Sequence, residues 1–252
     1  MQQHESLFRR VLDTSDRTEK PRAFGLTIGL DTGLGVRRAA DLVEVCAEHL
    51  DFIKIAWGSS LITGNLDAKL EIYRAGGVSP MLGGTLFEYA FLHRKLDDLF
   101  ALIRETKMHI EVSDGSIEIP TADKLKWIER FASVTEVWSE IGGKIALHVK
   151  DWGEVLRQEF GAGAKMVVVE GRQVGPVGQP IREHFVDELL QLAGGHERLI
   201  WEALERPQQL YFLKKLGPNC NLANIKTDDV LTLESFRRGL KEHTLLTWPV
   251  RG

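Results

Sequence analysis

Short apolar runs alternate with longer stretches of helical spacing from about residue 23 onwards. The apolar runs end in glycine or a polar residue, as buried strands do, and the stretches between them repeat apolar positions three or four residues apart. The runs start roughly 22–34 residues apart, close to the length of one strand–helix unit. Strands are predicted at Phe24–Leu30, Phe52–Ile55, Val78–Leu82, His109–Val112, Glu136–Ser139, Lys165–Val169, Leu199–Trp201 and Asn221–Ile225.

The helical stretches between these strands complete a regular strand–helix alternation. Such alternation predicts parallel strands joined by right-handed crossovers. Eight repeats within 252 residues favour a single-domain α/β fold, a closed (β/α)8 TIM barrel over residues 23–252, with residues 1–22 as a polar N-terminal arm. An open doubly wound sheet is the alternative. Helices are predicted at Val36–His49, Asp123–Phe131, Ile181–Leu192, Gln208–Leu216 and Leu231–Leu240.

Composition and charge narrow the possible partners. The formal net charge is −4 and the pI is about 6.1, so neither a nucleic acid nor an anionic membrane surface is expected as a partner. The sequence has no apolar run of about 18 residues and begins with a polar segment, which predicts a cytoplasmic protein. Its two cysteines, Cys46 and Cys220, are too few for a disulfide framework or a cysteine-based metal site.

Charged and polar residues gather where the predicted strands stop. In a parallel barrel the catalytic groups come from these carboxyl ends, and a buried ion without a partner is costly. We therefore interpret the set as one active site rather than as scattered structural charges. Its members are Asp31, Lys54, Glu88, Glu111, Asp114, Glu140, Lys144, Glu170, Arg172, Glu202 and Asn224.

The residue types favour a hard metal ion and an anionic ligand. Oxygen ligands from several strands suit Mg²⁺, whereas the lack of a Cys/His cluster argues against Zn²⁺. A lysine beside a metal or another cation has a lowered pKa and can move a proton near neutral pH. The stretch Gly83-Gly84-Thr85 is either a phosphate-binding loop or a tight turn. The sequence contains neither a P-loop nor a dinucleotide-binding glycine motif.

The strand-end motifs, in this order over about residues 20–245, resemble those of the phosphosulfolactate synthase family. That family adds sulfite to phosphoenolpyruvate on the route to coenzyme M. The matching stretches are Lys20-Pro21-Arg22, Asp31-x-Gly33-Leu34, Asp51-Phe52-Ile53-Lys54 with Trp57-Gly58, Gly83-Gly84-Thr85-Leu86-Phe87-Glu88, Glu111-Val112-Ser113-Asp114-Gly115-Ser116, Ser139-Glu140-Ile141-Gly142-x-Lys144, Glu170-x-Arg172, Glu202-Ala203 and Asn221-Leu222-x-Asn224.

The resemblance implies a Mg²⁺-dependent addition to phosphoenolpyruvate, a small phosphorylated anion, by a homo-oligomer. The metal would hold the substrate carboxylate and stabilise the aci-carboxylate that forms when the nucleophile attacks. Lys144 would then protonate the neighbouring carbon, with Glu140 and Lys54 as further catalytic residues. The implied substrate-binding residues are Lys54, Arg172, Gly84, Thr85, Ser113 and Asn224, and the candidate metal ligands are Glu111, Asp114, Glu140 and Glu170.

Three positions depart from the family pattern and indicate a divergent member. Thr32 replaces a lysine, while Gln173 and Val174 replace a glutamate and a serine. A lost lysine weakens the attraction for a doubly charged nucleophile, and a valine cannot hydrogen-bond an incoming anion. The alternatives are therefore the same scaffold with another nucleophile or enol phosphate, or a non-catalytic stress-associated protein of the same family.

Overall fold

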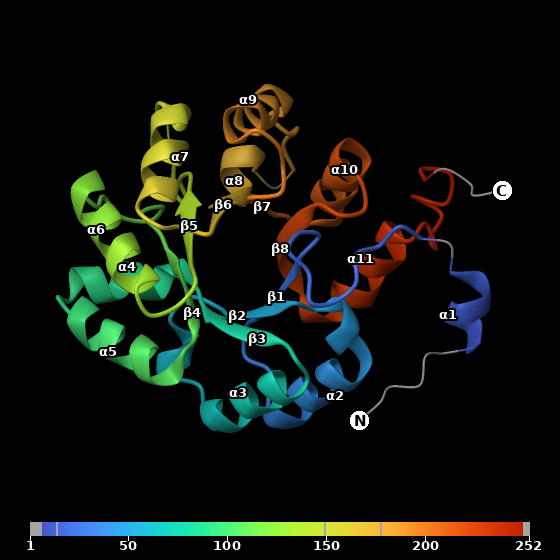
Figure 1. Ribbon diagram of the computed structural model, residues 1–252, viewed down its shortest axis with the longest axis horizontal. Helices are drawn as coiled ribbons and strands as arrows, with labels where there is room; N and C mark the ends of the chain where they lie inside the picture. Colours follow the sequence, from blue (N-terminus) through green and yellow to red (C-terminus); the bar gives the residue numbers. More distant parts are fainter. Residues whose placement is uncertain (1–6, 14, 149, 177, 249–252) are drawn as a thin grey trace.

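The eight strands close into a parallel barrel in the order β1 to β8. The structure, a computed structural model, describes residues 7–13, 15–148, 150–176 and 178–248 (Figure 1). The predicted barrel is confirmed and the open sheet is excluded, because β1 pairs with β8 as well as with β2. The strands are β1 (Thr27–Asp31), β2 (Phe52–Ile55), β3 (Ser79–Leu82), β4 (His109–Val112), β5 (Val137–Ile141), β6 (Met166–Val169), β7 (Leu199–Glu202) and β8 (Asn221–Lys226).

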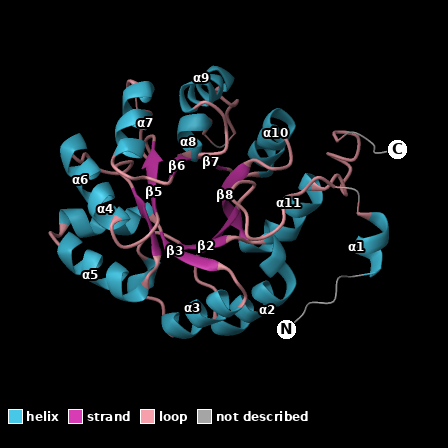
Figure 2. Cartoon of the chain, in the orientation of Figure 1, coloured by secondary structure: helices cyan, strands magenta, loops and turns pink. Residues whose placement is uncertain are grey.

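Helices surround the barrel, as Figure 2 shows. The five predicted helices are present with shifted ends, α1 is a short helix within the N-terminal arm, and α3, α4, α5, α7 and α8 are additional to the prediction. The helices are α1 (Leu7–Leu12), α2 (Val36–Cys46), α3 (Leu66–Ala75), α4 (Gly84–Leu92), α5 (Leu96–Thr106), α6 (Thr121–Ala132), α7 (Trp152–Gly161), α8 (Gly171–Val174), α9 (Glu183–Ala193), α10 (Arg206–Leu216) and α11 (Val230–Arg237), with short 3-10 turns at Ala47–His49, Ser59–Leu61 and Thr227–Asp229.

The barrel interior divides into an apolar layer and a charged layer. Successive side chains of a strand point to opposite faces, so the residue two positions after an inward-facing one also points inward. Phe52, Trp138 and Ile200 pack inside the barrel in one apolar cluster, and two positions after them on the same strands come Lys54, Glu140 and Glu202. The alternation therefore places charged side chains directly above the apolar filling, towards the carboxyl ends of the strands.

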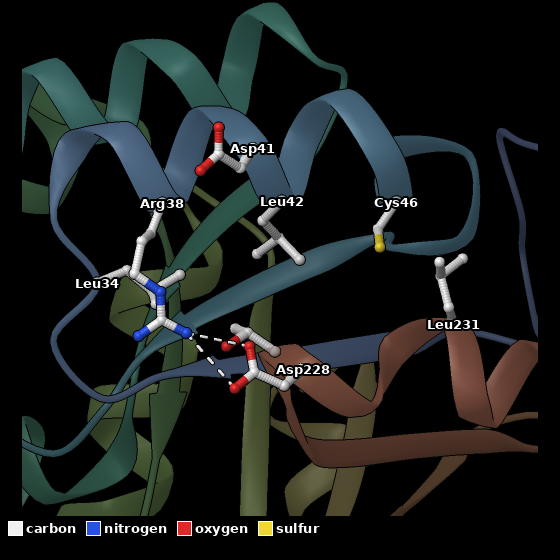
Figure 3. Close-up of a pocket in the computed structure, with 8 residues that line it drawn as sticks. Leu34, Arg38, Asp41, Leu42, Cys46, Asp228 and Leu231 are labelled. Atoms are coloured by element: carbon white, nitrogen blue, oxygen red, sulfur yellow. Dashed lines mark hydrogen bonds and ion pairs between the residues drawn. The ribbon is translucent and has the colours of Figure 1, made fainter.

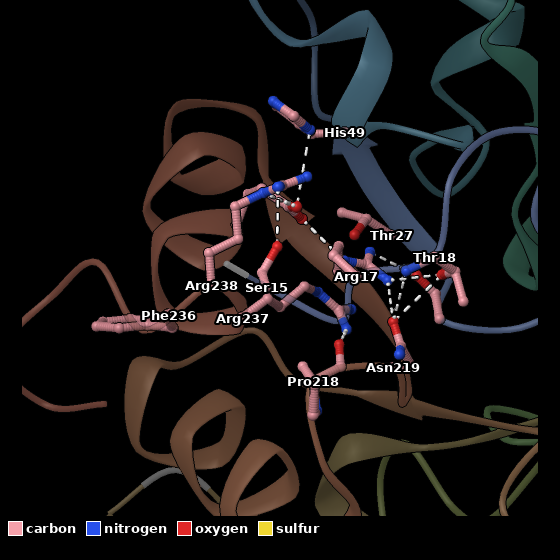
Figure 4. Close-up of polar contacts among 12 residues, drawn as sticks. Ser15, Arg17, Thr18, Thr27, His49, Pro218, Asn219, Phe236, Arg237 and Arg238 are labelled. Carbon is pink, nitrogen blue, oxygen red and sulfur yellow. Dashed lines mark hydrogen bonds and ion pairs between the residues drawn. The ribbon is translucent and has the colours of Figure 1, made fainter. Parts of the chain in front are cut away.

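The amino-terminal end of the barrel, here called the floor, is held by residues 15–22 and α11 (Figure 4). The buried guanidinium of Arg17 contacts Glu234 at 3.1 Å and donates to the carbonyl of Gly25 at 2.6 Å. Arg237 donates to the carbonyls of Cys220 and Leu26 at 2.8 and 3.1 Å, at the starts of β8 and β1. The floor therefore ties the first and last strands together.

Two further expectations concern membrane-spanning helices and disulfide bonds. Among the described residues, no helix is both long enough and apolar enough to cross a bilayer. Cys46 and Cys220 are free and buried, which agrees with the absence of a disulfide framework.

Candidate active site

Three glutamates from different strands meet inside the mouth of the barrel, at its carboxyl end. Glu111 on β4, Glu140 on β5 and Glu202 on β7 are all buried, and one carboxylate oxygen of each lies within 4.8 Å of the others. Lys54 on β2 joins two of them, because its Nζ lies 2.7 Å from Glu111 Oε2 and 3.2 Å from Glu202 Oε1. We call these three carboxylates the glutamate triad.

A second lysine reaches the triad from the loop after β5. The Nζ of Lys144 lies 3.1 Å from Glu140 Oε1 and 3.4 Å from Glu88 Oε1, and it donates to Ser113 Oγ at 2.8 Å. Its backbone amide donates to the carbonyl of Gly115 at 2.9 Å, which links the loop to the end of β4. With 21% of its side chain exposed, Lys144 contacts both the buried triad and solvent.

The cluster carries more negative than positive charge. Among the described residues, four carboxyl groups, from Glu88 and the triad, contact two ammonium groups, which is a formal excess of two negative charges when all four are ionised. Burial raises the pKa of Glu140 well above its usual range, and the neighbouring Glu111 and Glu202 add to this although Lys144 opposes it. Burial would also raise the pKa of Glu111, but the charges of Lys54 and Lys144 and a hydrogen bond with Glu140 together outweigh burial and lower the pKa to about 2.

Both lysines stay protonated in this setting. Burial lowers the pKa of Lys144, but the carboxylates of Glu140 and Glu88 outweigh it and raise the pKa above its ordinary value. The pKa of Lys54 is raised in the same way by Glu111 and Glu202. The direction is opposite to the one expected for a lysine beside a cation, because carboxylates are the nearest charges. Lys144 is therefore an ammonium that can donate a proton.

The triad fits a divalent metal ion. Its donors are all carboxylate oxygens, the ligands that Mg²⁺ and Ca²⁺ prefer. The buried Glu111 Oε2 and Glu140 Oε1 lie near lysines but accept no hydrogen bond. Two positive charges would balance the excess of two negative charges. The residues present therefore match a hard divalent cation in both charge and donor type.

Two of the four expected metal ligands lie outside the triad. Both carboxylate oxygens of Asp114 are taken by lysines, Lys124 at 3.0 Å and Lys150 at 2.8 Å. Glu170 caps α8, where it accepts from the amides of Arg172 and Gln173 at 2.6 and 3.2 Å. Burial and the nearby Glu202 raise the pKa of Glu170 to about 7, although those amides oppose the shift.

The expected substrate-binding residues fall into two groups. Gly84 and Ser113 belong to the buried network: Gly84 N donates to Glu111 Oε1 at 2.9 Å and Ser113 Oγ donates to Glu88 Oε1 at 2.7 Å. A Cβ on Gly84 would lie 2.5 Å from Ser113 Cβ, so only glycine fits there.

The remaining expected residues are more accessible. Arg172 is exposed, and Thr85 and Asn224 are half-buried. Asn224 has a left-handed backbone with φ of 58°, and its Oδ1 is buried without a hydrogen-bond partner. Such strain and an orphaned polar atom are typical of ligand-binding positions.

Glu202 was not among the candidate metal ligands, and Asp31 and Val174, two other residues that the sequence analysis singled out, lie away from the triad. Glu202 could have been found by alternation, since it follows the inward-facing Ile200 by two positions. The side chain of Asp31 points to the outer face of β1 and contacts Lys69 at 2.6 Å outside the barrel. Val174 is fully buried in the apolar layer between strands and helices, so its position does not support a role in an anion pocket.

Comparisons with known proteins identify the family. Residues 15–243 match the family model described as (2R)-phospho-3-sulfolactate synthase (ComA). The phosphosulfolactate synthase of Methanothermobacter thermautotrophicus is 38% identical, over 92% of this chain and 95% of its own length. The enzyme of Bacillus subtilis is 32% identical, over 92% of this chain and 97% of its own length.

Solved structures share the fold at much lower identity. A dihydrodipicolinate synthase of Agrobacterium tumefaciens is 10% identical with a TM-score of 0.56, covering 88% of this chain and 76% of that one. A 3-hexulose-6-phosphate synthase is 13% identical with a TM-score of 0.51, covering 82% and 98%. These likenesses show the fold alone, whereas the sequence matches show that the chain belongs to the phosphosulfolactate synthase family, whose members are lyases that form a carbon–sulfur bond.

Proposed function

We propose that this protein is a Mg²⁺-dependent enzyme that adds sulfite, or a related nucleophile, to phosphoenolpyruvate. The observation that carries the proposal is the pairing of a protonated, partly exposed Lys144 with a buried triad of excess negative charge. Homologues named phosphosulfolactate synthase, 32–38% identical over most of the chain, support the reaction class.

Glu111, Glu140 and Glu202 would hold the metal. Bound there, Mg²⁺ would supply positive charge beside the substrate's carboxylate group. The protein's own contribution is to keep these carboxylates buried, with Lys54 fixed between Glu111 and Glu202. Asp114 and Glu170 are less suited as direct ligands, because lysines occupy both carboxylate oxygens of Asp114 and two helix amides occupy Oε2 of Glu170.

Lys144 would act as the general acid. In the proposed reaction the sulfur of sulfite forms a bond to the methylene carbon of phosphoenolpyruvate, and the electrons of the double bond move towards the carboxylate. An ammonium N–H of Lys144 then protonates the carbon that bears the phosphate. Glu140 and Glu88 keep that lysine charged before the transfer, since their carboxylates raise its pKa.

The outer residues of the mouth would bind the substrate's anionic groups. The exposed guanidinium of Arg172 can approach a phosphate, and the side-chain amide of Asn224 can donate to it. Trp57, which follows β2 with a left-handed backbone at φ 52° and an exposed ring, would form a wall of the pocket.

A different nucleophile or enol phosphate is the second candidate. Thr32, which stands where the family pattern has a lysine, is exposed beside the end of β1, so this chain lacks one cation at the rim. A smaller positive potential favours a nucleophile of lower charge than sulfite. A non-catalytic role has less support, because the triad and both lysines are present and in mutual contact.

A single incubation series tests these alternatives. Purified protein with Mg²⁺ and phosphoenolpyruvate is mixed with sulfite and, separately, with small thiols and oxyanions, while phosphoenolpyruvate consumption is followed. We expect Mg²⁺-dependent consumption with sulfite that Lys144→Ala abolishes. Consumption only with another nucleophile would establish the second candidate. No consumption, together with no Mg²⁺-dependent thermal shift by phosphoenolpyruvate, would leave the non-catalytic role.

We further propose a homo-oligomer in the cytoplasm. α1 exposes Leu7, Phe8, Val11 and Leu12, an unusually apolar surface for a helix of six residues, which supports burial against another copy. The free thiols of Cys46 and Cys220 fit a reducing compartment. Phe8→Asp should lower the molar mass measured by light scattering, whereas a monomeric unsubstituted protein would contradict the oligomer.

A further inference from the structure

The loop from Gly142 to His148 carries Lys144, and burial of its side chains contributes little to holding it in place. Ile145 and Leu147 are 76% and 48% exposed, so their apolar side chains do not anchor it. At its near end the amide of Lys144 bonds to Gly115. Something other than packing must fix the remainder of the loop, because a general acid displaced by about 1 Å can lose up to a hundredfold in rate.

The side chain of Gln173 holds this loop from the other side. Its Oε1 accepts hydrogen bonds from the amides of Gly143 at 3.3 Å and His148 at 2.9 Å, and its Nε2 donates to the carbonyl of His148 at 2.9 Å. Gln173 is fully buried on α8. A Cβ on Gly142 would lie 2.7 Å from Gln173 Cβ, which shows how closely the loop backbone packs on this side chain.

We infer that Gln173 is a positioning residue, which sets the ammonium of Lys144 by clamping both ends of the loop that carries it. The bonded amides lie on either side of Lys144, at Gly143 and His148, so the clamp fixes the segment between them. This inference rests on the proposed role of Lys144. Gln173 itself contacts no residue of the triad in a hydrogen bond, so it acts through the loop.

A carboxamide suits the clamp, because its oxygen can accept from two amides while its nitrogen donates to a carbonyl. A glutamate keeps the two acceptor bonds but loses the donor and places a charge against the carbonyl oxygen of His148. A leucine of similar size loses all three bonds, each worth about 0.5–1.5 kcal/mol. The loop should therefore be best ordered with glutamine at position 173, less ordered with glutamate and least ordered with leucine.

The test compares Gln173→Leu and Gln173→Glu with a matched control, Gln209→Leu. Gln209 is equally buried, and its Nε2 bonds the carbonyl of Ala203 at 3.0 Å, away from the loop. Hydrogen exchange followed by mass spectrometry reports opening of the Gly143–His148 segment. We expect exchange there to rise at least tenfold in Gln173→Leu and less in Gln173→Glu, with no such rise in Gln209→Leu.

Two further measurements separate positioning from general destabilisation. In turnover of phosphoenolpyruvate, Gln173→Leu should lower kcat by ten- to hundredfold while KM changes less than threefold, with Gln173→Glu in between. The rate at which acetic anhydride labels Lys144, relative to the exposed Lys95, should rise in the same order. Exchange and labelling need no turnover, so they test the clamp even if the proposed reaction is wrong. Unchanged loop exchange, or faster exchange with unchanged kcat, would overturn the inference.

Discussion

The two ends of the barrel both collect buried charges, but they satisfy them differently. At the floor, Arg17 and Arg237 combine one carboxylate, Glu234, with backbone carbonyls at the starts of β1 and β8. At the mouth, the carboxylates of the triad meet two lysines and keep oxygens that accept no hydrogen bond.

The difference separates structural from functional charge. At the floor, backbone carbonyls and Glu234 take up most of the guanidinium donors without a ligand, although the buried Nε of Arg237 has no hydrogen-bond partner. At the mouth the buried carboxylates outnumber the ammonium groups, so a proton or a cation must relieve their repulsion, and the triad could hold a metal ion. This matches the general division of such barrels, in which stability resides at the amino-terminal face and chemistry at the carboxyl-terminal face. Substitutions at the mouth should therefore change catalysis, whereas substitutions at the floor should change stability.

The largest expected effect is on catalysis at the mouth. Lys144→Ala should lower kcat by about 10²–10⁴-fold, because the general acid is lost. Binding of phosphoenolpyruvate, followed by calorimetry with Mg²⁺ present, should stay within a few-fold of the unsubstituted protein. An Ala variant that retains turnover would remove Lys144 from its role.

At the floor the expected effect is on stability. Glu234→Gln leaves Arg17 without its buried counter-charge and should lower the free energy of unfolding by about 3–5 kcal/mol at neutral pH. Urea unfolding measures this loss, and turnover of the folded variant at low temperature serves as the control. Loss of kcat without loss of stability would contradict the division between the two ends.

The pH dependence of stability tests the same contribution of Glu234 at the floor. Burial tends to raise the pKa of Glu234. Arg17 and Arg237 oppose this effect, and the pKa falls from 4.5 to about 2. The unfolded state therefore binds a proton first, and the stabilisation present above pH 4.5 is lost as the pH falls towards 2. The shift corresponds to about 3 kcal/mol. Acid unfolding of Glu234→Gln should lack this contribution; identical pH profiles would refute it.

A smaller change of opposite sign is expected at the mouth. Burial and neighbouring carboxylates raise the pKa of Glu140, so its charged form is disfavoured without metal. Glu140→Gln should therefore stabilise the metal-free protein by about 1 kcal/mol at pH 8. It should also abolish the Mg²⁺-dependent rise in the unfolding midpoint. A variant that is destabilised without metal yet still responds to Mg²⁺ would argue against the triad.

The smallest effect is expected on the barrel's flank, in a groove of about 240 Å³ between α2 and α11 (Figure 3). Arg38 and Asp228 form an ion pair across it at 3.1 Å, with side chains 63% and 84% exposed. Exposed pairs contribute about 0–1 kcal/mol. Arg38→Ala should thus change the free energy of unfolding by no more than this amount and should leave turnover unchanged. A large effect on stability or on turnover would give the groove a role.

The sequence predicted the barrel because strand–helix alternation is a repeated, local signal. It missed α4, whose buried Leu86, Phe87 and Ala90 leave no single apolar stripe to detect. It also started β1 three residues early, at Phe24, where the left-handed Gly25 interrupts the extended chain.

For the site, the sequence identified Lys54, Glu111, Glu140 and Lys144, which the structure brings together. Lys54, Glu111 and Glu140 lie on strands, where alternation fixes the direction of a side chain, whereas Lys144 lies in the loop after β5. Asp114 lies beyond β4, and its direction is set by Lys124 of the following helix, a partner distant from the strand end. Alternation could also have placed Glu202 on β7, whereas the contacts of loop residues such as Asp114 and Lys144 come from the structure.

Metal binding by the triad is the central claim, and titration of the metal-free protein with Mn²⁺, followed by electron paramagnetic resonance, tests it most directly. The account predicts one bound ion per chain that Mg²⁺ displaces, and none in the variant combining Glu111→Gln, Glu140→Gln and Glu202→Gln. A triple variant that still binds one ion with comparable affinity, or an unsubstituted protein that binds none, would contradict it.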